Sequence, residues 1–294
     1  MNTPAGPEFR DPCLVDFGTA GGGSGRRLEL LGGVLVDRPL AAPDLPRRRT
    51  DLWSRAAAIY HAEGRGGRWE FAAPLPDPWQ IAVPLDGPTL SLEVRPAPSG
   101  QTGVFLEQAD LWKWLRSRTH AGIRMLSLFA HSGAASLALA AAGAEVVHVD
   151  ASRQAIALAR RNAAASGLAA APIRWVCEDA RTFVARELRR EARYAGAVLD
   201  PPSWGHGPRG QAFAIDRDLT PLVADVARLL DAGGGGPTGP LLLSCHAVNW
   251  HHRRLRDTLA SFCPARGLES GPLACTDAGG RPLQLGDFAR WSPA

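Results

Sequence analysis

The stretch Met125–Ala134 (MLSLFAHSGA) decides the fold. Its apolar run, Met125–Ala130, has the length of a buried strand and leads through His131-Ser132-Gly133 into a segment rich in alanine and leucine. The same alternation of apolar runs and Ala/Leu/Arg-rich helical segments continues through most of the remaining chain. Such alternation is typical of a doubly wound α/β fold with a parallel sheet.

Strands and helices alternate after residue 99. The predicted strands are Met125–Ala130, Glu145–Asp150, Ile173–Asp179, Ala195–Asp200 and Pro240–His246. The predicted helices are Leu106–Arg118, Ala135–Ala142, a helix that Ser152 caps and that ends at Ser166-Gly167, Ala180–Glu191, Asp216–Leu230 and Trp250–Phe262. An antiparallel C-terminal hairpin is predicted from Leu268–Leu273 and Phe288–Trp291, around the turn Asp277–Arg281. The expected fold class is a Rossmann-like α/β sheet, parallel except for this hairpin.

The first 98 residues have a different character, because they are dense in Gly and Pro and carry only short β-type runs. These runs are Arg27–Leu31, Gly33–Val36, Trp69–Ala72, Gln80–Val83 and Leu90–Arg95. Asp51–Ala62 (DLWSRAAAIYHA) is predicted as a helix, with Leu52, Ala56, Ile59 and Tyr60 near one face. The sequence thus predicts two domains, a small β-rich domain over residues 1–98 and an α/β domain over residues 99–294.

Composition places this chain of 294 residues among globular proteins, with 45% hydrophobic and 21% charged residues. No apolar run reaches the ~18 residues of a membrane span, and Met1–Arg10 lacks the basic region and apolar stretch of an export signal. The five cysteines include no Cys-x-x-Cys pair, which argues against a disulfide framework or a zinc ribbon. We therefore expect a cytoplasmic protein with no membrane segment.

The net charge of +4 is a weak argument for an anionic partner, since 33 basic residues accompany 29 acidic ones. Arginine binds phosphate through its planar fork, so Arg47-Arg48-Arg49 is a candidate contact to a nucleic-acid backbone. The alternative for this cluster is a solvated run of charge.

Ligands of open parallel sheets bind at the carboxyl ends of the strands, so the residues after each predicted strand form the candidate site. The turn Ala130–Gly133 holds one glycine where a dinucleotide enzyme needs Gly-x-Gly-x-x-Gly, which argues against NAD or FAD. A nucleoside without phosphates tolerates this turn. Asp150 is placed to accept both ribose hydroxyls, and Asp179 to accept from an adenine amino group. The alternatives are that both carboxylates are only polar strand ends and that Gly133 only starts a helix.

Five short motifs follow one another along residues 99–294. They are Gln101–Gln108 (QTGVFLEQ), Leu128–Gly133 (LFAHSG), Val149–Ser152 (VDAS), Glu178–Ala180 (EDA) and Leu199–Trp204 (LDPPSW). In this order they resemble S-adenosylmethionine-dependent class I methyltransferases, in particular the bacterial large-subunit rRNA base methyltransferases that act on cytosine C5 or guanine N7. Val34–Pro39 (VLVDRP) resembles a small β-domain fused to some members of this branch, whereas no RNA-binding module is recognisable.

The resemblance implies S-adenosylmethionine as cofactor and assigns a set of contact residues to it. These are Gln101, Thr102, Gly103, Phe105, Gln108, Phe129, His131, Ser132, Gly133, Asp150, Ala151, Ser152, Asp179, Ala180 and Asp200. For Gln101–Gln108 the alternative is a mere link between the two domains.

Asp200-Pro201-Pro202 follows the strand that lies beside the first one in this fold, so it should face the sulfonium methyl. Two prolines remove backbone donors and leave carbonyl oxygens and the Asp200 carboxylate as fixed acceptors for an amino group on a planar base. Trp204 could stack on that base. The alternative is a proline stop after a buried strand, with Trp204 in the core.

Cys245 ends the fifth strand next to His246, where a thiolate could add to cytosine C6 during C5 methylation. Its placement resembles the cysteine of the rRNA cytosine-C5 enzymes. However, Ala247–Trp250 departs from that family's pattern, and guanine enzymes of the branch need no cysteine. A buried structural cysteine is the alternative. No metal is predicted, because His246, His251 and His252 have no carboxylate or cysteine at metal-ligand spacing.

The function predicted first is transfer of the S-adenosylmethionine methyl to a base in structured RNA, with rRNA as the substrate. The second hypothesis, a small-molecule methyltransferase, is favoured by the modest net charge and by the lack of a recognisable RNA module. The third is a non-catalytic S-adenosylmethionine-binding protein, against which the intact Asp200-Pro201-Pro202 motif argues. The sequence names neither the methylated atom nor the oligomeric state.

Overall fold

A computed structural model describes residues 9–20, 23–40, 45–64, 66–207, 210–230 and 237–293 of the chain. Residues 1–8, on which the expectation about an export signal partly rests, lie outside the described residues. The chain forms two compact units, each assembled from separate segments. The first comprises Met1–Val83, Ser91–Glu107 and Ala274–Leu283, and the second comprises Pro84–Leu90, Gln108–Leu273 and Gln284–Ala294. The division into residues 1–98 and 99–294 stays a prediction.

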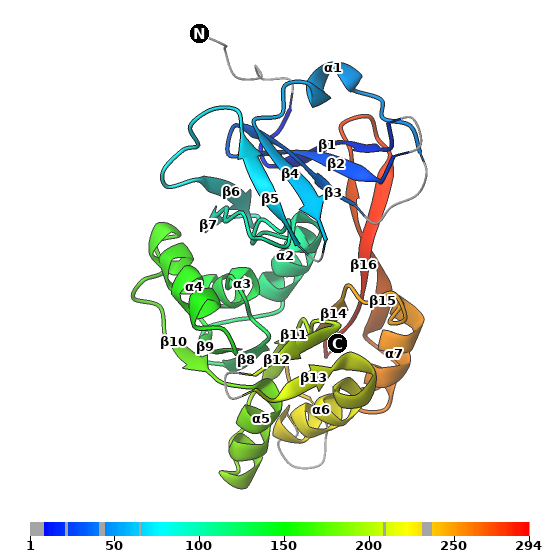
Figure 1. The fold of residues 1–294 in the computed structure, drawn as a ribbon. Coiled ribbons are helices and arrows are strands. Elements are labelled where there is room, and N and C mark those ends of the chain that lie inside the picture. The colour runs from blue at the N-terminus through cyan, green and yellow to red at the C-terminus, as the bar shows by residue number, and fades with distance from the viewer. Residues whose placement is uncertain are drawn as a thin grey trace. The chain divides into compact units, whose positions relative to one another are not determined.

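The second unit is built on a seven-stranded sheet in the order β10-β9-β8-β11-β14-β16-β15 (Figure 1). Its strands are β8 (Arg124–Leu128), β9 (Glu145–Asp150), β10 (Ile173–Cys177), β11 (Gly196–Leu199), β14 (Leu241–Cys245), β15 (Leu268–Thr276) and β16 (Pro282–Trp291). The pairs β8–β9, β8–β11, β9–β10 and β11–β14 are parallel, whereas β16 runs antiparallel to β14. The strand order reverses direction at β8, so β8 and β11 mark the switch point at which ligands of such sheets bind.

Helices cover both faces of this sheet. They are α2 (Ala109–Ser117), α3 (Ala134–Ala141), α4 (Arg153–Ala165), α5 (Ala180–Arg189), α6 (Ile215–Leu230) and α7 (His252–Ala260). Side chains alternate along β8, so Leu126 and Leu128 join the core with α5, α6 and α7, while Met125 packs with α2 and α3. Figure 1 shows α3 and α4 on one side of the sheet and α5 and α6 on the other. Burial on both faces explains why the parallel strands are continuous apolar runs in the sequence.

The structure confirms the Rossmann-like α/β fold class and each strand and helix predicted after residue 99. The ends differ most in the C-terminal hairpin, where both strands are longer than predicted. Ser152 caps α4 as predicted, accepting from the Ala155 N–H, and Leu106–Gln108 forms a 3-10 turn before α2. The hairpin of β12 (Trp204–His206) and β13 (Ala212–Ala214) was not predicted. No helix in the described part of the chain is long and apolar enough to cross a membrane.

The first unit contains a five-stranded sheet in the order β1-β2-β3-β4-β5. Its strands are β1 (Cys13–Gly18), β2 (Arg26–Leu31), β3 (Val34–Pro39), β4 (Ala58–Glu63) and β5 (Gly66–Phe71). A separate two-stranded sheet pairs β6 (Gln80–Pro84) with β7 (Thr89–Glu93). The predicted β-type runs correspond to β2, β3, β5, β6 and β7, whereas β1 and β4 were not predicted.

The predicted helix Asp51–Ala62 is wrong. Only α1 (Thr50–Trp53) is helical, and Ala58–Glu63 forms β4. β4 pairs in parallel with β3 and antiparallel with β5, so strands on both sides satisfy its backbone groups. This pairing, formed with segments distant in the sequence, overrides the helix propensity of the local alanines.

Asp16 of β1 is a fully buried carboxylate that joins three segments of the first unit. It accepts from the Trp53 indole at 2.7 Å and from the backbone N–H groups of Arg48 and Arg49 at 2.9 and 2.8 Å. It also pairs with the guanidinium of Arg281. Arg281 also pairs with the buried Asp277 at 2.7 Å, so the loss of Asp16 would leave this guanidinium with one carboxylate and would remove the acceptor of the Trp53 indole.

The arginine cluster Arg47-Arg48-Arg49 is therefore part of the folded unit. Arg47 stacks over Trp53, with its Cζ 3.7 Å from the ring centroid, and Arg49 pairs with Asp51 at 3.3 Å. A contact of this cluster with a nucleic-acid backbone stays a prediction.

We expect Asp16→Ala to lower the free energy of unfolding by about 3 kcal/mol, because the Trp53 indole and the N–H groups of Arg48 and Arg49 lose their common acceptor. Urea denaturation followed by tryptophan fluorescence measures the change. Asp51→Ala removes an exposed carboxylate of the same unit and serves as the control, with an expected change of less than about 0.5 kcal/mol. A variant as stable as the parent would show that the Asp16 cluster does not support the fold.

Candidate active site

The loop after β8 has a strained backbone. Phe129 and His131 lie in the left-handed region, with φ of 54° and 41°, and Gly133 follows with φ of 88°. Left-handed non-glycine residues cost roughly 1 kcal/mol each, so surrounding contacts must hold them. Gly133 is the N-cap of α3, and a Cβ there would come within 2.9 Å of the Cβ of Ala159. Both backbone conformation and packing therefore require glycine at this position.

Asp150, the last residue of β9, holds this loop. Its Oδ2 accepts from the His131 N–H at 2.8 Å, and its Oδ1 accepts from the Ser152 N–H at 2.8 Å. Asn162 of α4 adds a hydrogen bond to the Ser132 carbonyl at 2.9 Å. A carboxylate has about four acceptor sites, so each oxygen of the half-buried Asp150 keeps one for a further donor.

The loops after β9 and β10 lie beside each other. The Ala151 carbonyl accepts from the Cys177 thiol at 3.6 Å. Asp179 caps α5: its Oδ1 accepts from the Thr182 N–H at 3.0 Å and from the Thr182 hydroxyl at 3.2 Å, while its Oδ2 accepts from Arg181 at 3.2 Å. Ala180 is the buried first residue of α5. Asp179 is itself buried, and three of its acceptor sites are used, which leaves one on Oδ2.

Asp200 follows β11 and is fixed from two sides. Gln108 donates to its Oδ2 at 2.8 Å, and the Ser244 hydroxyl donates to its Oδ1 at 2.7 Å. Each oxygen again keeps one acceptor site. Ser244 was not predicted, although β14 is the neighbour of β11 and its last residues must lie beside Asp200. Pro201 is buried, whereas Pro202 is exposed.

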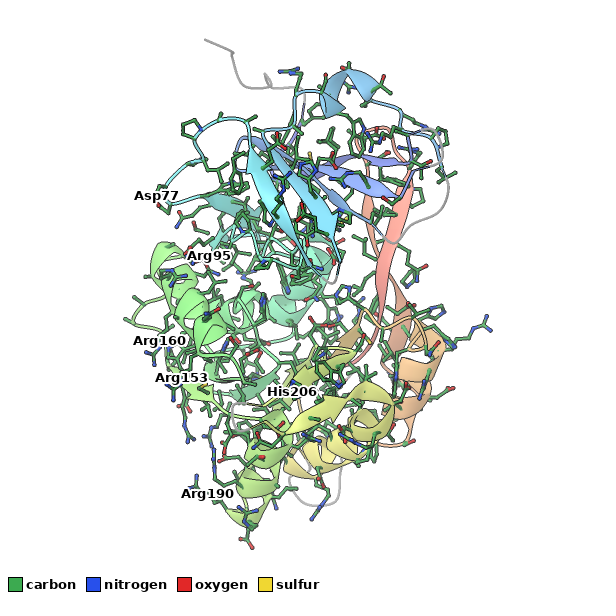
Figure 2. All side chains as sticks on the ribbon, in the orientation of Figure 1. Asp77, Arg95, Arg153, Arg160, Arg190 and His206 are labelled. Carbon is green, nitrogen blue, oxygen red and sulfur yellow. The ribbon has the colours of Figure 1, made fainter. Side chains whose placement is uncertain are left out.

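The β12–β13 hairpin stands directly after Asp200-Pro201-Pro202. Strands of three residues carry no readable period, so no sequence pattern predicts this hairpin. Phe213 packs against the ring of Phe129 with the centroids 5.0 Å apart. Trp204 is 61% exposed and lies 4.3 Å from the ring of His206, which Figure 2 labels on β12. The alternative that Trp204 fills the core is therefore wrong.

Cys245 is buried at the end of β14, with 1% of its surface exposed. Burial raises the pKa of its thiol to about 11, with Asp200 and Asp287 adding to the rise and the Ala247 N–H opposing it. The thiol is consequently protonated at neutral pH. The Nδ1–H group of His246 donates to the Leu285 carbonyl at 2.9 Å.

The motif Gln101–Gln108 is divided between the two units. Its predicted cofactor contacts that belong to the first unit are Gln101, Thr102, Gly103 and Phe105. Gln101 accepts from Arg38 at 3.0 Å, and Thr102 is fully buried, its carbonyl accepting from the Arg95 N–H at 2.8 Å. Gln108 belongs to the second unit and donates there to Asp200, whereas the cofactor contacts of the other four stay predictions.

No group of three or more His, Cys, Asp or Glu side chains that could hold a metal ion occurs within the residues described by the structure. His251 caps α7 by accepting from the Arg254 N–H at 3.4 Å. The ring of His252 lies 2.9 Å from Asp287. Both histidines thus have roles at the start of α7.

A Rossmann-like sheet with carboxylates at adjacent strand ends, and no glycine-rich phosphate loop, fits a protein that binds a nucleoside cofactor. The sequence profile of the S-adenosylmethionine-dependent methyltransferase family matches residues 68–246. A crystal structure of the SAM-dependent methyltransferase from Agrobacterium tumefaciens is 31% identical and superposes with a TM-score of 0.86, covering 98% of this chain and 92% of that one. The chain belongs to the S-adenosylmethionine-dependent methyltransferase family, and S-adenosylmethionine is its cofactor.

Two curated relatives can be aligned with about half of this chain. The ribosomal RNA large subunit methyltransferase K/L of Shewanella baltica is 33% identical over 145 residues, which is 49% of this chain and 19% of the relative. The protein of the same name from Methylococcus capsulatus is 31% identical over 164 residues, 55% of this chain and 21% of the relative. The chain thus matches about a fifth of the length of these relatives.

The acceptor sites left at the strand ends fit this cofactor. Asp150 offers two, which suits a ribose with two hydroxyls, and Asp179 offers one, which suits an exocyclic amino group. The loop Phe129–Gly133 connects β8 to α3 and lacks the repeated glycines of a pyrophosphate site.

Asp150→Ala should weaken S-adenosylmethionine binding by about 2 kcal/mol, the scale of lost charged hydrogen bonds. The variant removes two acceptor sites and also frees the His131 N–H. Isothermal titration calorimetry measures the affinity, and circular dichroism verifies that the fold is kept. Glu145→Ala, at the exposed other end of β9, is the matched control and should bind like the parent. Equal affinities of the two variants would place the ribose elsewhere.

Proposed function

We propose that this methyltransferase modifies a base in structured RNA and that rRNA is the substrate class. The observation that carries the proposal is the Asp200 carboxylate, fixed by Gln108 and Ser244, a few residues before the exposed ring of Trp204. A fixed acceptor that is followed in the chain by an exposed aromatic ring suits a planar base with an amino group. The names of the Shewanella and Methylococcus relatives, both ribosomal RNA large subunit methyltransferases, support the same substrate class.

We assign the cofactor to the carboxyl ends of β8, β9 and β10. Asp150 binds the ribose hydroxyls, Asp179 accepts from the adenine amino group, and the backbone of Phe129–Gly133 shapes the remaining wall. When bound, S-adenosylmethionine supplies a methyl group that its sulfonium makes electrophilic. The residues of the chain contribute by orienting the methyl acceptor, since a correctly oriented acceptor reacts far faster than a free one.

At the acceptor end, Asp200 and the backbone carbonyls of Pro201 and Pro202 accept from the amino group of the base. Neither proline has an N–H, so this segment presents acceptors without competing donors. Gln108 and Ser244 keep the carboxylate from turning away. Trp204 stacks on the base and fixes its plane.

A nitrogen acceptor is favoured over cytosine C5 by the state of Cys245. A C5 reaction needs a thiolate to add to C6, but burial raises the pKa of this thiol to about 11. At pH 7 only about one molecule in ten thousand would carry the thiolate, from the definition of pKa. We therefore assign Cys245 a structural role.

The second candidate is a small-molecule methyltransferase, which the modest net charge of +4 favours. Tritiated methyl transfer to bulk rRNA, to tRNA and to a metabolite extract, followed by nucleoside mass spectrometry, separates the two. Incorporation into rRNA supports the proposal, and incorporation into the extract alone overturns it. The five free cysteines suit a reducing compartment, so a cytoplasmic location is part of the proposal.

Asp200→Ala should lower the single-turnover methylation rate by about 100-fold, the scale of losing one positioned group at the reacting centre. Its affinity for S-adenosylmethionine should stay within about twofold of the parent, because the partner of Asp200 is the substrate. Asp225→Ala changes an aspartate on α6 that pairs with Arg228 and has a 42% exposed side chain, and serves as the control. A variant that keeps the parental rate would remove Asp200-Pro201-Pro202 from the reaction.

Cys245→Ser and Cys245→Ala should each methylate rRNA within about twofold of the parent rate, since nitrogen acceptors need no protein nucleophile. The pH profile gives a second readout. A thiolate nucleophile with a pKa near 11 would make the parent rate rise about tenfold per pH unit from pH 7 to 10, whereas we expect a nearly flat profile. Loss of activity in both variants, together with such a rise, would establish Cys245 as the nucleophile.

A further inference from the structure

Val248 is the most exposed large hydrophobic side chain in the described part of the chain. It is 96% exposed, whereas Leu45, Phe71 and Trp204 are 39%, 45% and 61% exposed. Single exposed apolar residues are common on protein surfaces, so exposure alone indicates nothing. The location of Val248 makes it notable, because it lies on the turn between β14 and α7. This turn follows the carboxyl end of β14, and the neighbouring strand β11 ends at Asp200.

The turn that carries Val248 is rigid. The Trp250 N–H donates to the Ala247 carbonyl at 3.0 Å, and the Trp250 side chain is almost fully buried. Arg254 of α7 donates to the Asn249 carbonyl at 3.1 Å. The backbone on both sides of the valine is thus fixed, so little conformational entropy is lost when a partner covers it.

The loop that carries Trp204 and the turn that carries Val248 are tied to the same helix. The carbonyl of the residue before Trp204 accepts from the N–H of Ile215, the first residue of α6, at 3.1 Å. The next residue, Asp216, accepts from the Trp250 indole at 2.9 Å. An aromatic ring and an apolar tip are therefore held in one framework around the start of α6.

Trp204 and Val248 together have the side-chain types that would hold a base outside its stack. A stacked base cannot reach the sulfonium methyl, and its extrusion costs a few kcal/mol. A protein offsets that cost by stacking the extruded base on an aromatic ring and by filling the gap with an apolar side chain.

We propose that Val248 is an apolar wedge that enters the base stack of folded RNA while the target base lies against Trp204. The inference rests on the proposed function and deepens it, because it names a stacked region of folded RNA, and not a flexible single strand, as the substrate.

The helix after the turn supplies positive charge next to the wedge. Arg253 of α7 is exposed, and within the described residues it has no ion-pair partner. Arg254 beside it is used in the framework, where it pairs with Asp216 at 3.0 Å. An apolar tip followed by an unpaired guanidinium fits a base stack flanked by phosphates better than it fits an apolar protein surface.

The test compares Val248→Thr, which keeps the side-chain shape but replaces one methyl by a hydroxyl, with Val248→Leu, which stays apolar. Both changes fall on an exposed side chain, so the fold should persist. The probe is in-vitro-transcribed large-subunit rRNA, used once refolded with Mg²⁺ and once as short single-stranded fragments. On folded RNA we expect Val248→Thr to lower the rate of methylation under subsaturating RNA about tenfold. On fragments both variants should stay within about twofold of the parent, and Val248→Leu should keep the parental rate on both forms.

Parental rates for Val248→Thr on folded RNA, or equal losses on both forms, would overturn the wedge while leaving RNA methylation in place. If the fragments accept no methyl, the contrast between the Thr and Leu variants on folded RNA decides. A parent protein that methylates neither RNA form, but does methylate a component of a metabolite extract, would overturn the proposed function and the wedge together.

Discussion

One carboxylate restrains the backbone on which the active edge of the sheet depends. The loop after β8 places Phe129 and His131 in the left-handed region, which is unfavourable for residues with a Cβ. Asp150 offsets that cost by accepting from the His131 N–H. It can do so because β8 and β9 are neighbours in a parallel sheet, so that their carboxyl ends meet. Parallel pairing thus brings together a strained loop and its restraint from segments that are separate in the sequence.

The three aspartates at the strand ends differ in how many of their hydrogen-bond acceptor sites the protein itself uses. Asp150 and Asp200 each use one acceptor site per oxygen within the protein, so each can serve a ligand with both oxygens. Asp179 uses three sites on the first turn of α5. On the proposed assignment, the adenine end of the cofactor is therefore held by one hydrogen bond to Asp179 and by the aromatic wall of Phe129 and Phe213. Shape should govern recognition there more than hydrogen bonding does.

The sequence predicted the α/β sheet well because each strand and the helix after it are local patterns. It failed where the structure depends on distant partners. Ala58–Glu63 is a strand only because β3 and β5 flank it. The motif Gln101–Gln108 is contiguous in the sequence, yet its two glutamines serve different units, since Gln101 binds Arg38 and Gln108 binds Asp200. The sequence also did not predict that the Cys245 thiol is protonated, because its raised pKa comes from burial by the surrounding elements.

These features imply that the acceptor end works by position. The Asp200 carboxylate is held by two donors, and Cys245 is buried as a thiol. The loop that carries Trp204 and the turn that carries Val248 are both hydrogen-bonded to the start of α6. Because the backbone of these two segments is fixed, selectivity must come from the few side chains that they expose. Two of the exposed side chains there, Trp204 and Val248, are apolar, whereas Ser203, His206, His246 and Asn249 are exposed and polar. On the proposed assignment, the apolar pair acts on the shape and stacking of the base, and the hydrogen bonds of Asp200 then choose among the bases that fit.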